Sequence, residues 1–159
     1  MTCGELVPTV DKNAALIALS ESLHMNDEPF AVQSLPRRVF TAIWSLESEV
    51  NNGGFAQYFV NSSSQSASFV ITALEAIGAH NMADICRCAF KKAFPEGLPD
   101  TPKKIAESVK SRYDVLEEEL EPFSHEFYSY PDDLTELLFE FVVNHPEEFG
   151  DVTANETGG

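Results

Sequence analysis

Apolar side chains recur at three- and four-residue intervals along almost the whole chain, and this spacing constrains the fold more than any other feature. Leu16, Leu19 and Leu23 repeat in this way near the N-terminus, as an amphipathic helix requires. We find no convincing segment with the alternation of apolar and polar residues that is typical of a strand. The sequence therefore predicts an all-α fold, a single compact domain of about seven helices.

Capping residues and helix breakers divide this pattern into segments. Asp11 and Thr101 are suitable N-caps, and Pro102 fits the first turn of a helix. Asn51-Asn52-Gly53-Gly54 is expected to stop a helix, because Asn and Gly accept the left-handed conformation of a helix C-terminus. We therefore expect helices over about 11–25, 34–50, 55–61, 65–77, 80–94, 102–120 and 132–144, with a turn at 62–64.

The chain length of 159 residues fits one domain. We predict a helical domain over residues 1–150 and a flexible tail over 151–159. No apolar run approaches the roughly 18–20 residues that span a bilayer, so we expect no membrane partner. The three cysteines are odd in number, which favours a reducing compartment and predicts a cytoplasmic protein.

Charge is distributed very unevenly along the chain. Residues 113–159 contain fourteen acidic side chains and no Lys or Arg, so they supply −14 of the net charge of −16. Such a field repels nucleic acid and attracts basic surfaces. We therefore expect no direct binding to nucleic acid, and a basic protein as the partner.

The acidic residues fall on the solvent side of the expected helices. In the helix over 102–120 they follow an i, i+3, i+4, i+7 pattern, which spans roughly 10.5 Å at 1.5 Å per residue. One DNA strand places roughly three phosphates in that length. We expect Lys103 to pair with Glu107, and Lys110 with Asp114, in the first half of this helix. The candidate partner-binding residues are Asp114, Glu117, Glu118, Glu121, Asp132, Asp133, Glu136, Glu140, Glu147 and Glu148.

The string Asn51-Asn52-Gly53-Gly54-Phe55-Ala56-Gln57-Tyr58-Phe59 resembles the signature of a bacterial family, and Ala73–Ala79 also looks like its pattern. This is the DNA-mimic-protein-like family, whose domain was long labelled as of unknown function. The resemblance covers residues 35–95 well and the acidic helices, about 102–149, only loosely. It implies a helical fold that is often a homodimer. In one branch it implies capture of a DNA-binding regulator through an acidic surface.

The motif itself has two interpretations. In the architectural one, Gly53 and Gly54 permit a tight turn and the aromatic residues pack, while Asn51 and Asn52 satisfy helix-end carbonyls. Gln57 or Asn61 would then hydrogen-bond to nearby backbone. In the other interpretation, the polar side chains form a pocket that binds a small polar ligand: Glu47, Asn51, Asn52, Gln57 and Tyr58.

Other chemistry receives little support from the sequence. Cys86 and Cys88 lie two apart on a helix and point about 200° apart, which is poor geometry for a shared metal or disulfide. The four histidines lack zinc-site spacing, and no nucleophile or phosphate-loop motif is present. We therefore expect no catalytic residue, no metal and no cofactor.

The predicted function is a DNA mimic that occupies the DNA-binding surface of a basic protein such as a transcriptional regulator. The alternative is a helical domain that binds a small polar ligand, or an uncharacterised enzyme, at the Asn51–Gly54 turn.

Overall fold

The computed structural model describes residues 11–23, 28–61 and 65–152. Within these ranges it has eight α-helices, one 3-10 helix and no strand, which confirms the predicted all-α class. The predicted turn at 62–64 and the tail from 153 onwards lie outside the described residues. The elements are α1 (Lys12–Ser22), η2 (Phe30–Val32), α2 (Leu35–Val60), α3 (Ala67–Ala76), α4 (His80–Ala93), α5 (Pro102–Lys110), α6 (Tyr113–Tyr128), α7 (Leu134–Val143) and α8 (Pro146–Phe149).

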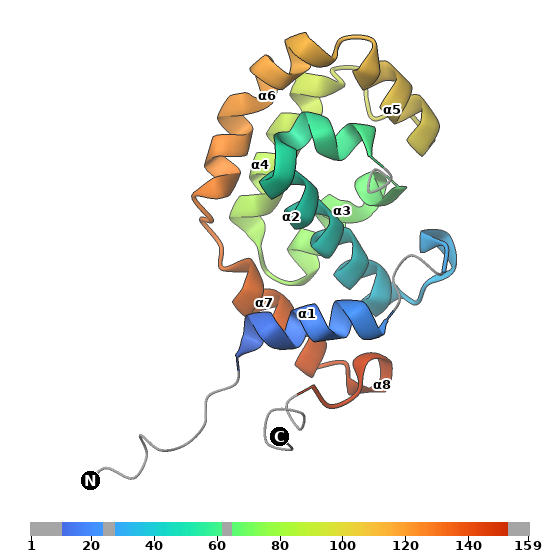
Figure 1. The fold of residues 1–159 in the computed structure, drawn as a ribbon, viewed down its shortest axis with the longest axis vertical. Helices are drawn as coiled ribbons and strands as arrows, with labels where there is room; N and C mark the ends of the chain where they lie inside the picture. Colours follow the sequence, from blue (N-terminus) through green and yellow to red (C-terminus); the bar gives the residue numbers. More distant parts are fainter. Residues whose placement is uncertain (1–10, 24–27, 62–64, 153–159) are drawn as a thin grey trace, which may run out of the picture.

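The helix α2 runs through the middle of the molecule (Figure 1). α3, α5 and α6 pack against it, and α4 packs against α3 and α6. Phe40, Ile43 and Leu46 on α2 have no exposed surface, as the apolar stripe of the sequence predicts. Burial of these side chains from several sides makes α2 the centre of the hydrophobic core.

The helical geometry of α2 is interrupted at one residue, Gly54, with φ 84° and ψ 179°. The first helical segment ends a few residues later than predicted, because Asn51, Asn52 and Gly53 remain helical and the break falls at Gly54. This backbone conformation is essentially restricted to glycine. The motif therefore separates two helical segments of α2 at Gly54, and the second segment begins at Phe55, where the sequence predicts a new helix.

The prediction of one continuous helix over 102–120 is wrong, because α5 ends at Lys110 and α6 begins at Tyr113. Arg112, between them, has φ −141° and ψ 34°. Its guanidinium donates a hydrogen bond to the Ala93 carbonyl over 2.6 Å and lies 5.7 Å from the ring centroid of Phe94. The chain bends where Arg112 makes these contacts with the end of α4, and neither contact is visible in local sequence.

α6 extends beyond the expected end at Leu120 and passes through Pro122 to Tyr128. A proline inside a helix costs about 3 kcal/mol or more, because it lacks an N–H and crowds the preceding turn. Continued burial on one side of the helix offsets this cost. The side chains on that side that are 5% exposed or less are Leu116, Leu120, Ser124 and Phe127.

The helices α1, α7 and α8 gather at the end of the molecule opposite α5 (Figure 1). Asp11 and Asp133 cap α1 and α7 by accepting hydrogen bonds from backbone N–H groups three residues on, both over 3.1 Å. The ammonium of Lys12 lies 2.5 Å from a carboxylate oxygen of Glu136. This ion pair joins α1 to α7.

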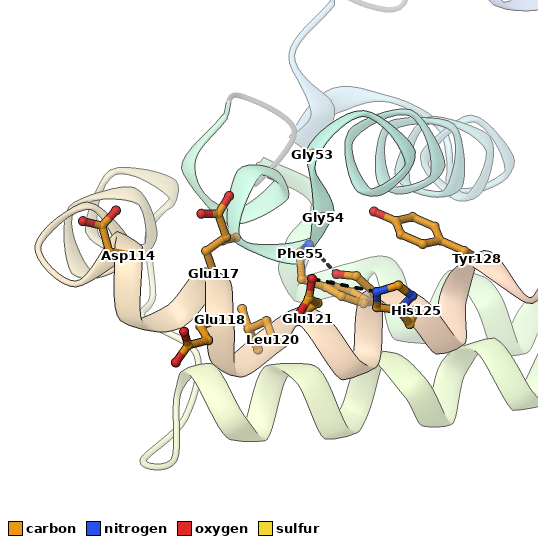
Figure 2. A pocket seen from close by; sticks show the side chains of 12 residues that line it. Gly53, Gly54, Phe55, Asp114, Glu117, Glu118, Leu120, Glu121, His125 and Tyr128 are labelled. Atoms are coloured by element: carbon orange, nitrogen blue, oxygen red, sulfur yellow. Dashed lines mark hydrogen bonds and ion pairs between the residues drawn. The ribbon is translucent and has the colours of Figure 1, made fainter.

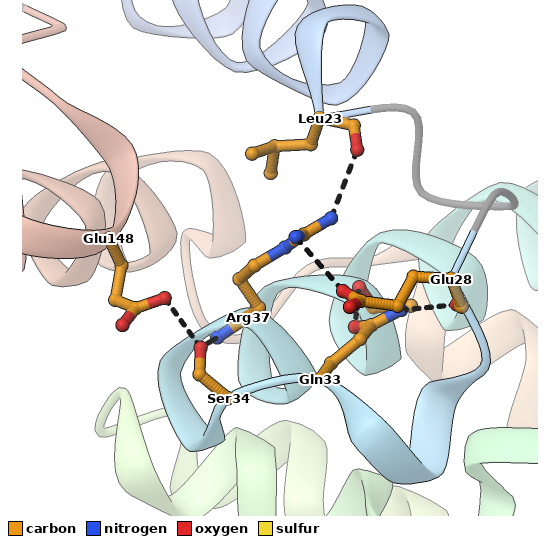
Figure 3. A network of polar contacts seen from close by, with 7 residues as sticks. Leu23, Glu28, Gln33, Ser34, Arg37 and Glu148 are labelled. Carbon is orange, nitrogen blue, oxygen red and sulfur yellow. Dashed lines mark hydrogen bonds and ion pairs between the residues drawn. The ribbon is translucent and has the colours of Figure 1, made fainter.

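A network of hydrogen bonds and an ion pair links the start of α2 to α8 and to the segment after α1 (Figure 3). The Arg37 guanidinium donates to the Leu23 carbonyl over 3.0 Å and to a Glu28 carboxylate oxygen over 3.1 Å. The Ser34 hydroxyl, which caps α2, donates to Glu148 over 2.5 Å. The network connects the residue after α1, the start of α2 and α8.

Candidate partner-binding face

The acidic side chains of α6 border a hollow beside the kink of α2. The hollow has a volume of about 400 Å³, and Gly53 and Gly54 form part of its wall. In Figure 2, Glu117 and the Tyr128 hydroxyl point toward α2. The lining residues on α6 are Asp114, Glu117, Glu118, Leu120, Glu121, Ser124, His125 and Tyr128. The structure thus brings the family-like motif and the acidic helix to one place, although they lie far apart in the sequence.

Two hydroxyl groups of α6 bind backbone groups on either side of the kink. The Ser124 oxygen accepts a hydrogen bond from the N–H of Phe55 over 3.2 Å. The Tyr128 hydroxyl donates to the carbonyl of Val50 over 2.9 Å. A break in a helix frees N–H groups after it and carbonyl groups before it. Because residues four apart share a helix face, Ser124 and Tyr128 supply one partner to each side.

The four candidate acids on α6 are exposed, in agreement with their predicted solvent position: Asp114, Glu117, Glu118 and Glu121. A carboxylate oxygen of Glu121 lies 3.8 Å from the imidazole of His125. The expected pairs Lys103–Glu107 and Lys110–Asp114 do not form within 4.0 Å in the described part of the chain. Lys110 and Asp114 cannot form the expected i, i+4 contact, because they lie on different helices on either side of the bend.

Several candidate acids beyond α6 have structural partners. Asp132 accepts hydrogen bonds from the N–H of Met82 over 2.8 Å and from the Asn81 amide over 3.1 Å. It therefore serves the N-terminus of α4. Asp133 caps α7, Glu136 pairs with Lys12, and Glu148 accepts from Ser34, whereas Glu140 and Glu147 are exposed. These acids also contribute negative charge, but some of their carboxylate oxygens are already bonded.

The polar side chains of the motif bond to other side chains and do not converge on one cavity. The Tyr130 hydroxyl donates to Glu47 over 2.7 Å and accepts from Asn51 over 2.7 Å. Burial raises the pKa of Glu47, the hydrogen bond from Tyr130 lowers it, and the nearby charge of Asp133 raises it. Burial is also the main cause that raises the pKa of Tyr130 to about 12.

The amides on the far side of the kink share one acceptor. Gln57 and Asn61 both donate to the same carboxylate oxygen of Glu49, over 2.8 Å and 2.6 Å. The expectation that they bond to backbone is therefore wrong for these contacts. Tyr58 is completely buried, and burial raises the pKa of its phenol. Asn52 is exposed. This arrangement does not form the polar pocket that the motif suggested.

The described residues contain no group of three or more His, Cys, Asp or Glu side chains that is arranged to hold a metal ion. Cys86 is buried and Cys88 is exposed, which agrees with their expected opposite directions. No helix in the described ranges is long and apolar enough to cross a membrane.

A family model described as DMP19-like protein matches residues 33–145 of the chain. The chain belongs to the DMP19-like protein family. This confirms the predicted membership of the DNA-mimic family, and the matched region includes α6 and the kink of α2 as well as residues 35–95. The DMP19-like family is not a known enzyme family. Comparisons with curated proteins and with solved structures found no match.

Sequence reasoning missed four residues that shape this face of the DMP19-like protein: Glu49, Ser124, Tyr128 and Tyr130. Ser124 and Tyr128 are spaced i, i+4, which indicates a shared helix face. Both residues lie beyond the end of the helix predicted over 102–120, so this spacing falls outside the predicted helices. Their partners on α2 can be identified only from the packed structure.

Proposed function

We propose that this DMP19-like protein is a DNA mimic, an acidic interaction protein that occupies the DNA-binding surface of a basic protein such as a transcriptional regulator. The observation that carries this proposal is the acidic face of α6, in a chain of the DNA-mimic family. We define the α6 face as Asp114, Glu117, Glu118 and Glu121, all exposed and all beside the hollow. A surface that binds phosphates presents Lys and Arg, which these carboxylates would pair with instead.

The hollow gives the α6 face a shape as well as a charge. Its volume of about 400 Å³ lies at the lower end of the range for ligand pockets, roughly 300–1,000 Å³. We propose that one basic side chain of the partner enters it. The carboxylates would approach the cation from α6, while the exposed ring of Tyr128 would contact its aliphatic stem.

The acidic residues that already form contacts within the protein would contribute to partner binding mainly through their charge. Asp132, Asp133, Glu136 and Glu148 would add to the negative field that attracts the partner, whereas Glu140 and Glu147 have exposed carboxylates for direct contact. Long-range attraction of this kind raises the association rate and weakens as salt is added.

Capture followed by competition tests the proposal. The tagged protein is incubated with host lysate at low salt, and each captured protein is then purified with its own DNA site. We expect a basic DNA-binding protein to be captured, and increasing amounts of this protein to displace it from labelled DNA in a gel-shift assay. If no captured DNA-binding protein releases its DNA at saturating concentrations of this protein, mimicry is contradicted.

We also propose that the protein forms a homodimer and is located in the cytoplasm. The resemblance to the family is the basis for the dimer, and sedimentation of the purified protein at several concentrations tests it. The alternative of a small-ligand site receives less support, because its proposed pocket residues do not line the hollow. Glu47 and Gln57 are hydrogen-bonded to other side chains, and Tyr58 is buried.

A further inference from the structure

The last turn of α4 and the helix α5 lie at one end of the molecule (Figure 1). These two segments carry five exposed lysines. We call this the lysine end: Lys91, Lys92, Lys103, Lys104 and Lys110. The hydrogen bond from Arg112 to the Ala93 carbonyl holds the α5–α6 junction against the end of α4. On α5, Ile105 and Val109 are buried, so the lysines occupy the outer side.

Among the described residues, most of these lysines have no acidic side chain within ion-pair distance, although the chain contains 26 acidic residues. Lys104 lies 3.2 Å from Asp100, and no other member of the lysine end has an ion pair within the described ranges. Residues 91–112 contain six basic and three acidic side chains, whereas residues 113–152 contain thirteen acidic and no Lys or Arg. The boundary between the two regions falls at the bend between α5 and α6.

We infer that the lysine end orients the basic partner by repelling it from α5, so that the partner docks along α6, α7 and α8. This inference rests on the proposed function and adds a repulsive boundary to the attractive α6 face. The Debye length is about 8–10 Å at physiological ionic strength, so a docking protein responds to the local charge of each end and not only to the net charge. Interfaces reject wrong arrangements by placing like charges together.

A defined cationic probe tests the orientation without knowledge of the natural partner. We would add a spin-labelled oligoarginine peptide to the isotopically labelled protein at low salt and measure the loss of backbone amide signals by NMR. Signals from α6, α7 and α8 should lose intensity, while those from α5 and the last turn of α4 should keep it. In the K103Q/K104Q/K110Q variant, the loss should extend over α5.

A matched control has the same change in net charge at another site. Gln65, Ser68 and Thr72 are exposed, near or within α3, and the Q65E/S68E/T72E variant should leave the α5 signals intact. Equal loss on α5 and α6 in the parent protein, no loss on α6, or an unchanged pattern in the triple-glutamine variant would each overturn the inference. These outcomes are separate from the proposed function, which fails if no captured DNA-binding protein releases its DNA.

Discussion

The hydroxyl oxygen of Ser124 accepts a hydrogen bond from the backbone N–H of Phe55, 3.2 Å away and 69 positions earlier in the chain. This bond joins α6 to α2 just after the Gly54 kink. Ser124 is 5% exposed, so water has little access to the freed N–H. The acidic helix therefore also completes the hydrogen bonding of the bent helix, and the position of the α6 face depends on this contact.

Removal of each hydroxyl should destabilise the protein to a different extent. Ser124→Ala leaves the N–H of Phe55 without its acceptor, and a buried unsatisfied group costs about 1–3 kcal/mol. Tyr128→Phe removes the donor to the Val50 carbonyl. Val50 has no exposed surface, but Tyr128 is 43% exposed and lines the hollow, so water from the hollow can take the place of the hydroxyl and we expect a loss of about 0.5–1.5 kcal/mol. Urea unfolding of both variants measures these losses. A larger loss for Tyr128→Phe than for Ser124→Ala would contradict the role assigned to burial.

Substitution of Gly54 by Ala should lower the free energy of unfolding by at least 1–3 kcal/mol, roughly the cost of a residue forced into such a backbone conformation. The new Cβ would also lie 3.1 Å from the Ser124 oxygen. Gly53→Ala is the matched control, because Gly53 is helical and alanine favours a helix by about 1 kcal/mol. This gain in helix stability is offset by the cost of moving the Gln57 side chain, because the new Cβ of residue 53 would lie 1.9 Å from its Oε1 atom. Thermal melts should show a much smaller loss for Gly53→Ala, and equal losses would contradict the kink's dependence on Gly54.

The raised pKa of Glu47 predicts a specific pH dependence of stability. A carboxyl whose pKa is higher in the folded state favours folding when it is protonated, so its contribution increases as the pH falls through the raised pKa toward the usual 4.5. Glu47→Gln keeps an acceptor for Tyr130 but cannot titrate. As the pH falls through that range, the free energy of unfolding of the parent should therefore rise relative to that of the variant. A difference that is flat with pH would contradict the effect of burial.

Charge reversal on the α6 face should weaken partner binding without unfolding the protein. Because these side chains are exposed, E117K/E118K/E121K should change stability by less than about 0.5 kcal/mol per site. We expect binding to weaken at least tenfold, about 1.4 kcal/mol or more. The control E21K/E96K/E107K has the same charge change at exposed positions outside the α6 face and should bind more tightly than the α6 variant. Titrations with the captured partner and thermal melts test both, and equal affinity of the two variants would place the binding site elsewhere.

A substitution in the hydrophobic core should lower stability and leave the affinity of the folded protein for its partner unchanged. Phe59 has no exposed surface, and its ring centroid lies 5.0 Å from those of Phe90 and Phe94. Phe59→Ala should therefore cost about 3–5 kcal/mol of stability. Its remaining folded fraction should bind the partner with parental affinity, which separates loss of fold from loss of contact.

The sequence by itself determined the helical class, the capping residues Asp11 and Thr101, and the solvent position of the α6 acids. These features depend on spacings of three or four residues, so local sequence contains the necessary information. The bend at Arg112, the continuation of α6 through Pro122 and the pairing of the kink with Ser124 and Tyr128 were decided by the tertiary structure. Each depends on burial or hydrogen bonding between segments as far as 78 positions apart, which local periodicity cannot encode.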